Sequence, residues 1–155
     1  MKNDKVEKLA TWPIYSSDEI SAVKSVLSSG KVNYLNGDQG HKFETEFSSW
    51  SGAKYSIAIA NGTLALDLAL NALGIGKGDE VIVTPRSFIA SVSSVINCGA
   101  KPIFADVDIN SGNIYPESIK KVISNRTKAV ICVHLAGWPC DMEGILNLSI
   151  KHNFY

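Results

Sequence analysis

Residues 56–73, SIAIANGTLALDLALNAL, are the stretch that sets the fold class of this chain. The apolar run 56–60 has the length and composition of a short buried strand. Asn61-Gly62-Thr63 follows as a tight turn, and the run 64–73 has the apolar spacing of a helix. A strand that turns directly into a helix is the repeating unit of α/β proteins.

The same alternation continues towards the C-terminus. Further strands are predicted at 80–84, 101–107 and 128–134, and further helices at 88–97, 116–123 and 141–152. The strands are apolar throughout rather than alternating, which favours burial on both faces of a sheet. We therefore predict an α/β fold with three layers, α/β/α, and a mainly parallel sheet. Residues 153–155 have the character of a first step into another strand, so we expect the βα series to be incomplete at Tyr155.

Two helices are predicted before this region. Ser16 and Glu19 have the spacing of a capping box, and the helix that they open ends at Gly30. Residues 31–40 are polar and glycine-rich, which predicts a loop. The next helix places Phe43, Phe47 and Trp50 on one face and ends at Gly52. We assign residues 1–30 to an N-terminal helical segment and residues 31–155 to an incomplete large domain.

Composition excludes several classes of function. Fifteen basic residues balance fifteen acidic ones without a basic run, so we expect no nucleic-acid partner. No apolar stretch approaches the length of a membrane span, and the polar start has no apolar secretory segment. Three cysteines are too few and too irregular for a disulfide scaffold. We expect a cytoplasmic protein with reduced thiols and no membrane association.

The turn at Gly62 and Thr63 is the first candidate site. Ligands of parallel α/β sheets bind beyond the carboxyl ends of the strands. A helix N-terminus there offers free N–H groups and a partial positive charge, which suit a phosphate. Gly62 permits close backbone approach, and the Thr63 hydroxyl is a further donor. The alternative is that Thr63 is only a helix cap.

Further candidates follow the next strands. Phe88 could stack on a flat heterocycle, although an aromatic residue in such a place is more often core. Asp106 and Asp108 could bind a metal or act as acid and base, but turn capping ahead of residues 110–112 fits them better. No dinucleotide fingerprint, phosphate-binding P-loop or hydrolase nucleophile elbow is present.

Cys132, His134 and Cys140 raise the question of a zinc site. Their spacing matches no usual zinc pattern and supplies only three ligands, so we predict no metal. His134 is better interpreted as a polar residue at the mouth of a strand, either close to a ligand or hydrogen-bonded in place.

Taken together and in order, four segments resemble the DegT/DnrJ/EryC1/StrS aminotransferases. The segments are residues 60–70 with 73–83, PRSFIA at 85–90, GAKPIFADVD at 99–108 and VHLAG at 133–137, and the match is collinear from about Lys31 to Tyr155. The resemblance implies a fold-type-I enzyme dependent on pyridoxal 5'-phosphate (PLP), of which this chain forms part of the large domain. It also implies a homodimer, a nucleotide-linked keto-sugar as substrate and an amino acid, glutamate, as nitrogen donor.

The resemblance also implies roles for single residues. Gly62 and Thr63 match the family's phosphate cup, and Phe88 matches the aromatic residue stacked on the cofactor ring. Asn36 lies in a segment near the sugar-nucleotide site, and His134 lies in a strand-end motif without a catalytic step assigned to it. Arg86 stands where the family usually has a small or polar residue.

Two family residues have no counterpart within these 155 residues, so no catalytic residue is assigned here. The aspartate that pairs with the pyridinium nitrogen and the Schiff-base lysine are both expected C-terminal of Tyr155. None of Lys101, Lys120, Lys121, Lys128 and Lys151 matches the lysine's motif. We therefore expect residues 1–155 alone to be inactive. Two alternatives stay open: a sugar dehydratase of the same family, with histidine replacing the lysine, and a non-catalytic remnant that binds a phosphate ligand or a partner.

Overall fold

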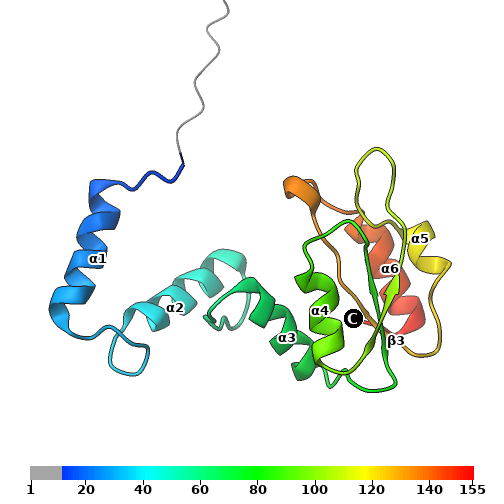
Figure 1. Cartoon of the computed structure of the whole chain (residues 1–155), viewed down its shortest axis with the longest axis horizontal. Coiled ribbons are helices and arrows are strands. Elements are labelled where there is room, and N and C mark those ends of the chain that lie inside the picture. The colour runs from blue at the N-terminus through cyan, green and yellow to red at the C-terminus, as the bar shows by residue number, and fades with distance from the viewer. Residues whose placement is uncertain (1–11) are drawn as a thin grey trace, which may run out of the picture. The chain divides into compact units, whose positions relative to one another are not determined.

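The computed structural model describes residues 12–155, which divide into two compact units (Figure 1). One unit extends to Ala58 and the other runs from Ile59 to Tyr155. Within the described residues, none of the helices is both long enough and apolar enough to cross a bilayer.

The first unit contains helices α1 (Ser17–Ser29) and α2 (Gln39–Ser51). The predicted capping box opens α1: the Glu19 N–H donates to Ser16 Oγ at 3.2 Å, and the Ser16 N–H donates to Glu19 Oε2 at 2.6 Å. Gly30 ends the helix in the left-handed conformation, with φ of 69°. Both ends of α1 are therefore where the sequence predicts them.

Helix α2 carries a row of aromatic side chains. The ring centroids of Phe43 and Phe47 are 5.7 Å apart, and those of Phe47 and Trp50 are 5.5 Å apart. The predicted shared face is confirmed, and the left-handed Gly52 ends the helix as expected.

The segment after α2 is not the strand predicted at 56–60, and this prediction was wrong. No strand is assigned there, and Ile57 is 71 % exposed. The Ala58 N–H donates to a side-chain oxygen, Glu44 Oε1 at 2.8 Å, instead of to a backbone carbonyl. An apolar run becomes a strand only when a neighbouring strand accepts its hydrogen bonds, and local composition does not reveal whether one is present.

The second unit is the α/β part of the chain. Its sheet has the order β2-β1-β3, and both neighbouring pairs are parallel. The elements in chain order are α3 (Gly62–Ala72), β1 (Glu80–Val83), α4 (Ala90–Asn97), β2 (Lys101–Phe104), α5 (Pro116–Lys120), β3 (Thr127–Val130), the 3-10 turn η1 (Leu135–Gly137) and α6 (Met142–His152). The parallel sheet was predicted, but the strands are fewer and shorter than the apolar runs suggested.

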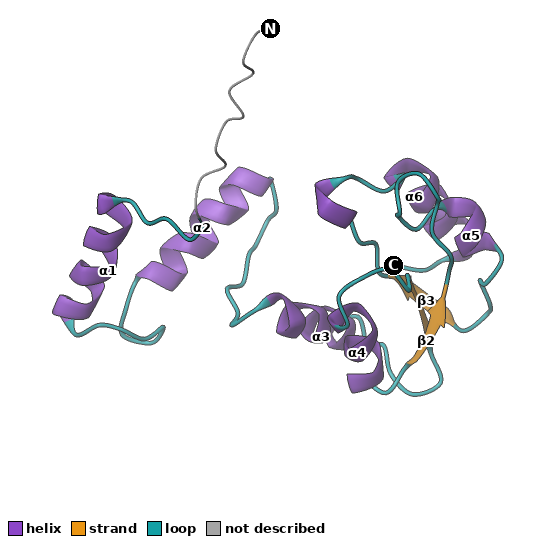
Figure 2. Ribbon diagram, turned by 45° about the horizontal axis from the view of Figure 1, so that its top comes forward, coloured by secondary structure: helices purple, strands orange, loops and turns teal. Residues whose placement is uncertain are grey.

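Helices cover both faces of this sheet, as Figure 2 shows. Side chains alternate along β1, so Val81 and Val83 face one way and Ile82 the other. Val81 and Val83 pack in the core with residues of α3 and α4, whereas Ile82 packs with residues of α5 and α6. The predicted three-layer α/β/α arrangement is therefore confirmed for this unit.

The sequence predicted that the strands are buried on both faces of the sheet, and of the three strands this is fully true for β1 alone. All four of its residues are buried, because it is the central strand. The edge strand β2 is partly exposed, with Phe104 at 52 %. The prediction from the apolar composition of the strands therefore gave more burial than the edge strand β2 has in the structure.

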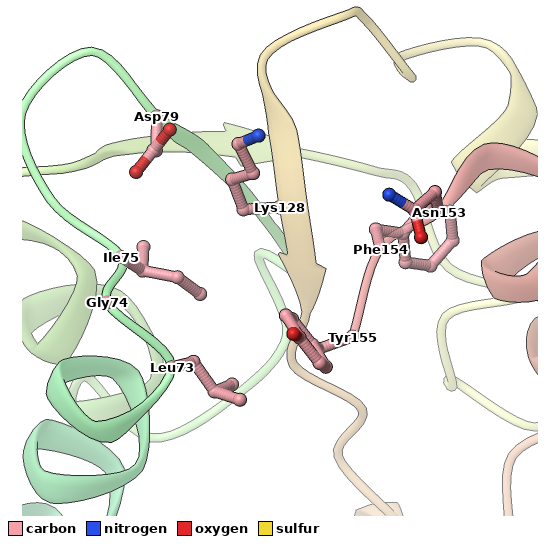
Figure 3. A pocket seen from close by; sticks show the side chains of 8 residues that line it. All are labelled: Leu73, Gly74, Ile75, Asp79, Lys128, Asn153, Phe154 and Tyr155. Atoms are coloured by element: carbon pink, nitrogen blue, oxygen red, sulfur yellow. The ribbon is translucent and has the colours of Figure 1, made fainter.

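Residues 153–155 follow α6 and run beside β3 (Figure 3). The Tyr155 N–H donates to the Lys128 carbonyl, and the Tyr155 carbonyl accepts from the Val130 N–H, both at 2.8 Å. This pair of bonds is the parallel ladder pattern, so Tyr155 has the backbone pairing of a strand residue, as predicted. Beside it lies a cavity of about 360 Å³, whose lining includes Leu73, Asp79 and Lys128. None of the predicted site residues lines this cavity.

One buried carboxylate connects β1 to the turn before β3. Glu80 is 3 % exposed and accepts from Ser124 Oγ at 2.5 Å and from Arg126 Nη2 at 2.6 Å. The Ser124 hydrogen bond lowers the pKa of Glu80 most, burial opposes it, and the Arg126 charge lowers the pKa further. The ionised carboxylate is therefore favoured by the fold.

We expect Glu80→Gln to lower the free energy of unfolding by about 1–2 kcal/mol at pH 7, because the charge-assisted bonds are lost. Since the folded-state pKa lies below the unfolded one, this contribution is complete above the unfolded value, about pH 4.3. It disappears as the pH falls through the lower folded value.

Urea unfolding of the purified protein at several pH values measures the difference between wild type and variant. Glu117→Gln is the control, because Glu117 is exposed and lies 3.9 Å from Lys120; its cost should stay below about 1 kcal/mol. A Glu80→Gln difference that persists unchanged at low pH would contradict the role of the charge.

Candidate functional site

The topology brings several loops to the carboxyl edge of the sheet. Each parallel strand ends at this edge, where the chain continues into residues 84–89 after β1, 105–115 after β2 and 131–141 after β3. Helix α3 leads into the start of β1 through a short connection, so α3 runs opposite to β1 and its own N-terminus points towards the same edge. Phe88 and His134 therefore lie in loops at this edge, and the end of α3 that carries Gly62 and Thr63 is directed towards it.

The N-terminus of α3 has the features of a phosphate site. Asn61 is the N-cap, and its side chain accepts from the Leu64 N–H at 3.0 Å. Thr63 is thus not the cap, and that alternative interpretation was wrong. Among the described residues, no hydrogen-bond partner is found for the N–H groups of Gly62 and Thr63 or for the Thr63 hydroxyl. Three donors at the positive end of a helix are therefore available to an anion.

Gly62 itself leaves open space at this position. Apart from its chain neighbours and the backbone of α3, a Cβ atom built on Gly62 would meet no heavy atom of the described residues within 4 Å. Internal packing and backbone conformation therefore do not require glycine here. A physical reason for glycine at position 62 is that a ligand can then approach the backbone closely.

The ring of Phe88 is not part of the core. It is 74 % exposed and lies in the turn between β1 and α4. The turn itself is ordered: the Phe88 carbonyl accepts from the Ser91 N–H at 3.1 Å, and the hydroxyls of Ser87 and Ser91 are 2.7 Å apart. An exposed aromatic ring on a fixed turn can stack on a planar ligand.

His134 is held in place by its own loop. Its Nδ1 accepts from the Cys140 N–H at 3.1 Å, so the neutral ring carries its proton on Nε2. The side chain is exposed, and Nε2 is directed to no hydrogen-bond partner among the described residues. The predicted hydrogen-bonded histidine at a strand mouth is thus present in the structure.

The two aspartates after β2 act as turn residues, as predicted. Asp108 Oδ1 accepts from the N–H groups of Asn110 and Ser111 and from the Ser111 hydroxyl, at 2.8–3.1 Å. These bonds, led by the one from the Ser111 N–H, lower the pKa of Asp108. Asp106 accepts from the neighbouring Val107 N–H at 2.8 Å.

Cys132 and Cys140 are protonated thiols. Burial, and to a smaller extent the nearby Cys140, raises the pKa of Cys132 to about 11, and burial also raises the pKa of Cys140. The Cys140 thiol donates to the Val133 carbonyl at 3.2 Å. Within residues 12–155, no group of three or more His, Cys, Asp and Glu side chains has the arrangement of a metal site.

Asn36 belongs to the first unit. It is exposed, and its N–H donates to Asn33 Oδ1 at 3.0 Å. It lines a cavity of about 320 Å³ together with residues of α1 and of the loop before α2, among them Ser29, Lys31 and Asp38. Its assignment to a sugar-nucleotide site stays a prediction.

Sequence reasoning missed a buried residue that organises the edge. Asn113 is 3 % exposed; its Nδ2 donates to the Trp138 carbonyl at 2.8 Å, and its Oδ1 accepts from the Leu135 N–H at 3.0 Å. The side chain therefore ties the loop after β2 to η1, which follows His134. In the sequence, Asn113 is one more polar residue of a turn, and no local signal distinguishes it.

Comparisons with known proteins identify the family of this chain. Residues 13–155 match the sequence profile of the DegT/DnrJ/EryC1/StrS aminotransferase family. The chain is 45 % identical to the GDP-perosamine synthase of Escherichia coli O157:H7 over 131 residues, which are 84 % of this chain and 35 % of that protein. It spans 35–39 % of the length of the curated relatives that it matches.

Two solved structures show the fold. The aminotransferase from Psychrobacter cryohalolentis superposes with a TM-score of 0.92 at 60 % identity, over 94 % of this chain and 37 % of that one. The PLP form of Spr1654 from Streptococcus pneumoniae gives a TM-score of 0.85 at 29 % identity, over 92 % and 36 %. The profile match, the sequence identities and the fold agree, and the chain belongs to the DegT/DnrJ/EryC1/StrS aminotransferase family.

Proposed function

We propose that the protein carrying this chain is a PLP-dependent aminotransferase that transfers an amino group from glutamate to a nucleotide-linked keto-sugar. The observation that carries the proposal is the N-terminus of α3, where the N–H groups of Gly62 and Thr63 and the Thr63 hydroxyl have no hydrogen-bond partner among residues 12–155. Membership of the family and the name of the E. coli relative, a GDP-perosamine synthase, support the reaction class.

The residues present fit the cofactor. Gly62 and Thr63 would hold its phosphate by charge-assisted hydrogen bonds, which open space at Gly62 permits. Phe88 would cover one face of its ring, since its side chain is exposed on an ordered turn. Bound PLP supplies an electron sink for the transfer of the amino group.

His134 and Asn36 are proposed as substrate contacts. His134 presents Nε2 as a hydrogen-bond donor at the same edge of the sheet, because Nδ1 is occupied by the Cys140 N–H. Asn36 presents an exposed amide in the loop before α2. We further propose a cytoplasmic homodimer in which residues 31–155 contribute part of the PLP-binding domain.

Residues 1–155 by themselves are proposed to be inactive, because none of their lysines matches the family's Schiff-base motif. The protein that carries the chain should turn yellow with PLP and lose this colour when glutamate is added. With glutamate and nucleotide-linked keto-sugars, mass spectrometry should detect an amino-sugar nucleotide. Loss of water from the sugar without gain of nitrogen would favour the dehydratase, and failure to bind PLP would overturn the proposal.

A further inference from the structure

A second feature of the carboxyl edge is a cavity of about 490 Å³ that all three strand-end loops line. Arg86 comes from the loop after β1, Asn110 and Ser111 from the loop after β2, and Leu135, Ala136 and Trp138 from the segment after β3. The proposed cofactor contacts Gly62, Thr63 and Phe88 are not among these lining residues.

Arg86 is exposed, and its guanidinium group lies against Gly112 at this cavity. A Cβ atom built on Gly112 would lie 2.5 Å from Arg86 Nη1, 3.1 Å from Arg86 Cζ and 3.0 Å from Leu135 Cδ2. Gly112 also has a φ of 71°, a conformation that other residues rarely adopt. The guanidinium therefore rests on the bare backbone of Gly112, and a larger residue there would displace it.

This guanidinium has no partner within the part of the chain that the structure describes. It forms neither an ion pair nor a side-chain hydrogen bond there, whereas Arg126, the other arginine, pairs with Glu80. The carboxylate in the same loop, Asp108, already accepts three hydrogen bonds from Asn110 and Ser111. The guanidinium, a planar fork of donors, thus lines the cavity and has no carboxylate partner among residues 12–155.

Hydrogen bonds hold η1, the segment after β3 that lines the cavity beside Arg86. Asn113 holds both ends of η1 through the Leu135 N–H and the Trp138 carbonyl. Ala136, inside η1, has a φ of 51°, which is uncommon for a residue with a side chain and indicates that its surroundings hold it there. The Trp138 side chain is 66 % exposed and provides an apolar surface beside the charge.

We propose that Arg86 binds an oxyanion of a substrate in this cavity and that Trp138 covers the adjoining part of the ligand. The guanidinium fork matches both carboxylate and phosphate, so the oxyanion is either the carboxylate of the amino-acid donor or a phosphate of the nucleotide-sugar. This proposal rests on the proposed transamination, because that reaction supplies both classes of substrate.

The test compares Arg86→Gln and Arg86→Lys with wild type in the protein that carries this chain. We expect Arg86→Gln to raise the KM for one of the two substrates, glutamate or the nucleotide-sugar, at least tenfold, with kcat changed less than twofold. The affected substrate identifies the oxyanion. Arg86→Lys should recover only part of the loss, because an ammonium group keeps the charge but not the fork.

Lys77→Gln is the matched control, since it removes the same charge from an exposed position before the amino end of β1. Calorimetric titrations with L-glutamate and with dTDP supply a readout that does not require turnover. Equal binding of both probes by wild type and Arg86→Gln, or binding of neither by wild type, would overturn the role of Arg86. A wild type that binds a probe through Arg86 but transfers no amino group would overturn the proposed reaction alone.

Discussion

Replacing Gly62 by aspartate should reduce PLP affinity at least 100-fold while slightly raising the stability of the fold. The two effects have opposite signs because they come from the same helix end. A carboxylate at the N-terminus of α3 interacts favourably with the helix dipole, by about 0.3–1 kcal/mol. It also occupies the position proposed for the phosphate and repels it. The added side chain has room, since no other part of the described chain lies within 4 Å of its Cβ position.

Equilibrium dialysis with PLP and thermal unfolding without PLP measure the two effects separately. Gly62→Ala adds bulk without charge and should lose less affinity than Gly62→Asp. Ser17→Asp, at the first position of α1, is the control for a new carboxylate at a helix start and should leave PLP affinity unchanged. If Gly62→Asp binds PLP as wild type does, the phosphate does not lie at the N-terminus of α3.

Asn113→Ala is expected to lower the free energy of unfolding by about 2–3 kcal/mol, because two hydrogen bonds of a side chain that is only 3 % exposed are lost together. The variant leaves the Leu135 N–H and the Trp138 carbonyl without their partner. Urea unfolding of the purified protein gives the value from the transition midpoint at an unchanged slope.

Two further variants distinguish the effect of the two Asn113 hydrogen bonds from the general effect of replacing an asparagine. Asn97→Ala should cost less than about 1 kcal/mol, because the Asn97 amide reaches the Asp67 carboxylate only at 3.3 and 3.4 Å on an exposed surface. Asn113→Asp keeps the oxygen that accepts from the Leu135 N–H but loses the donor to the Trp138 carbonyl. It should therefore still be destabilised, and a stability equal to wild type would show that the Trp138 bond contributes nothing.

The sequence predicted those features of the fold that depend on neighbours along the chain. The capping box of Ser16 and Glu19, the helix ends at Gly30 and Gly52, and the turn formed around Asp108 all form as expected. Each depends on hydrogen bonds that close over a few residues, so local residue types are sufficient to specify it. The α/β class was predicted from the alternation of apolar runs, whereas α3 begins at Gly62, two residues before the predicted start at residue 64.

The tertiary structure decided what depends on residues far apart in the chain. The run 56–60 has a strand composition but lacks strand pairing, and its Ala58 N–H donates to the Glu44 carboxylate, 14 residues away. Likewise Asn113 reaches Trp138, 25 residues away, and the Arg86 guanidinium lies over Gly112. The sequence by itself determined the class of the fold, its helix ends and the phosphate-binding turn as a candidate. Only the tertiary structure showed which residues Asn113 and Arg86 contact. Packing brings these groups together across the chain, and no hydrophobic periodicity in the sequence indicates such contacts.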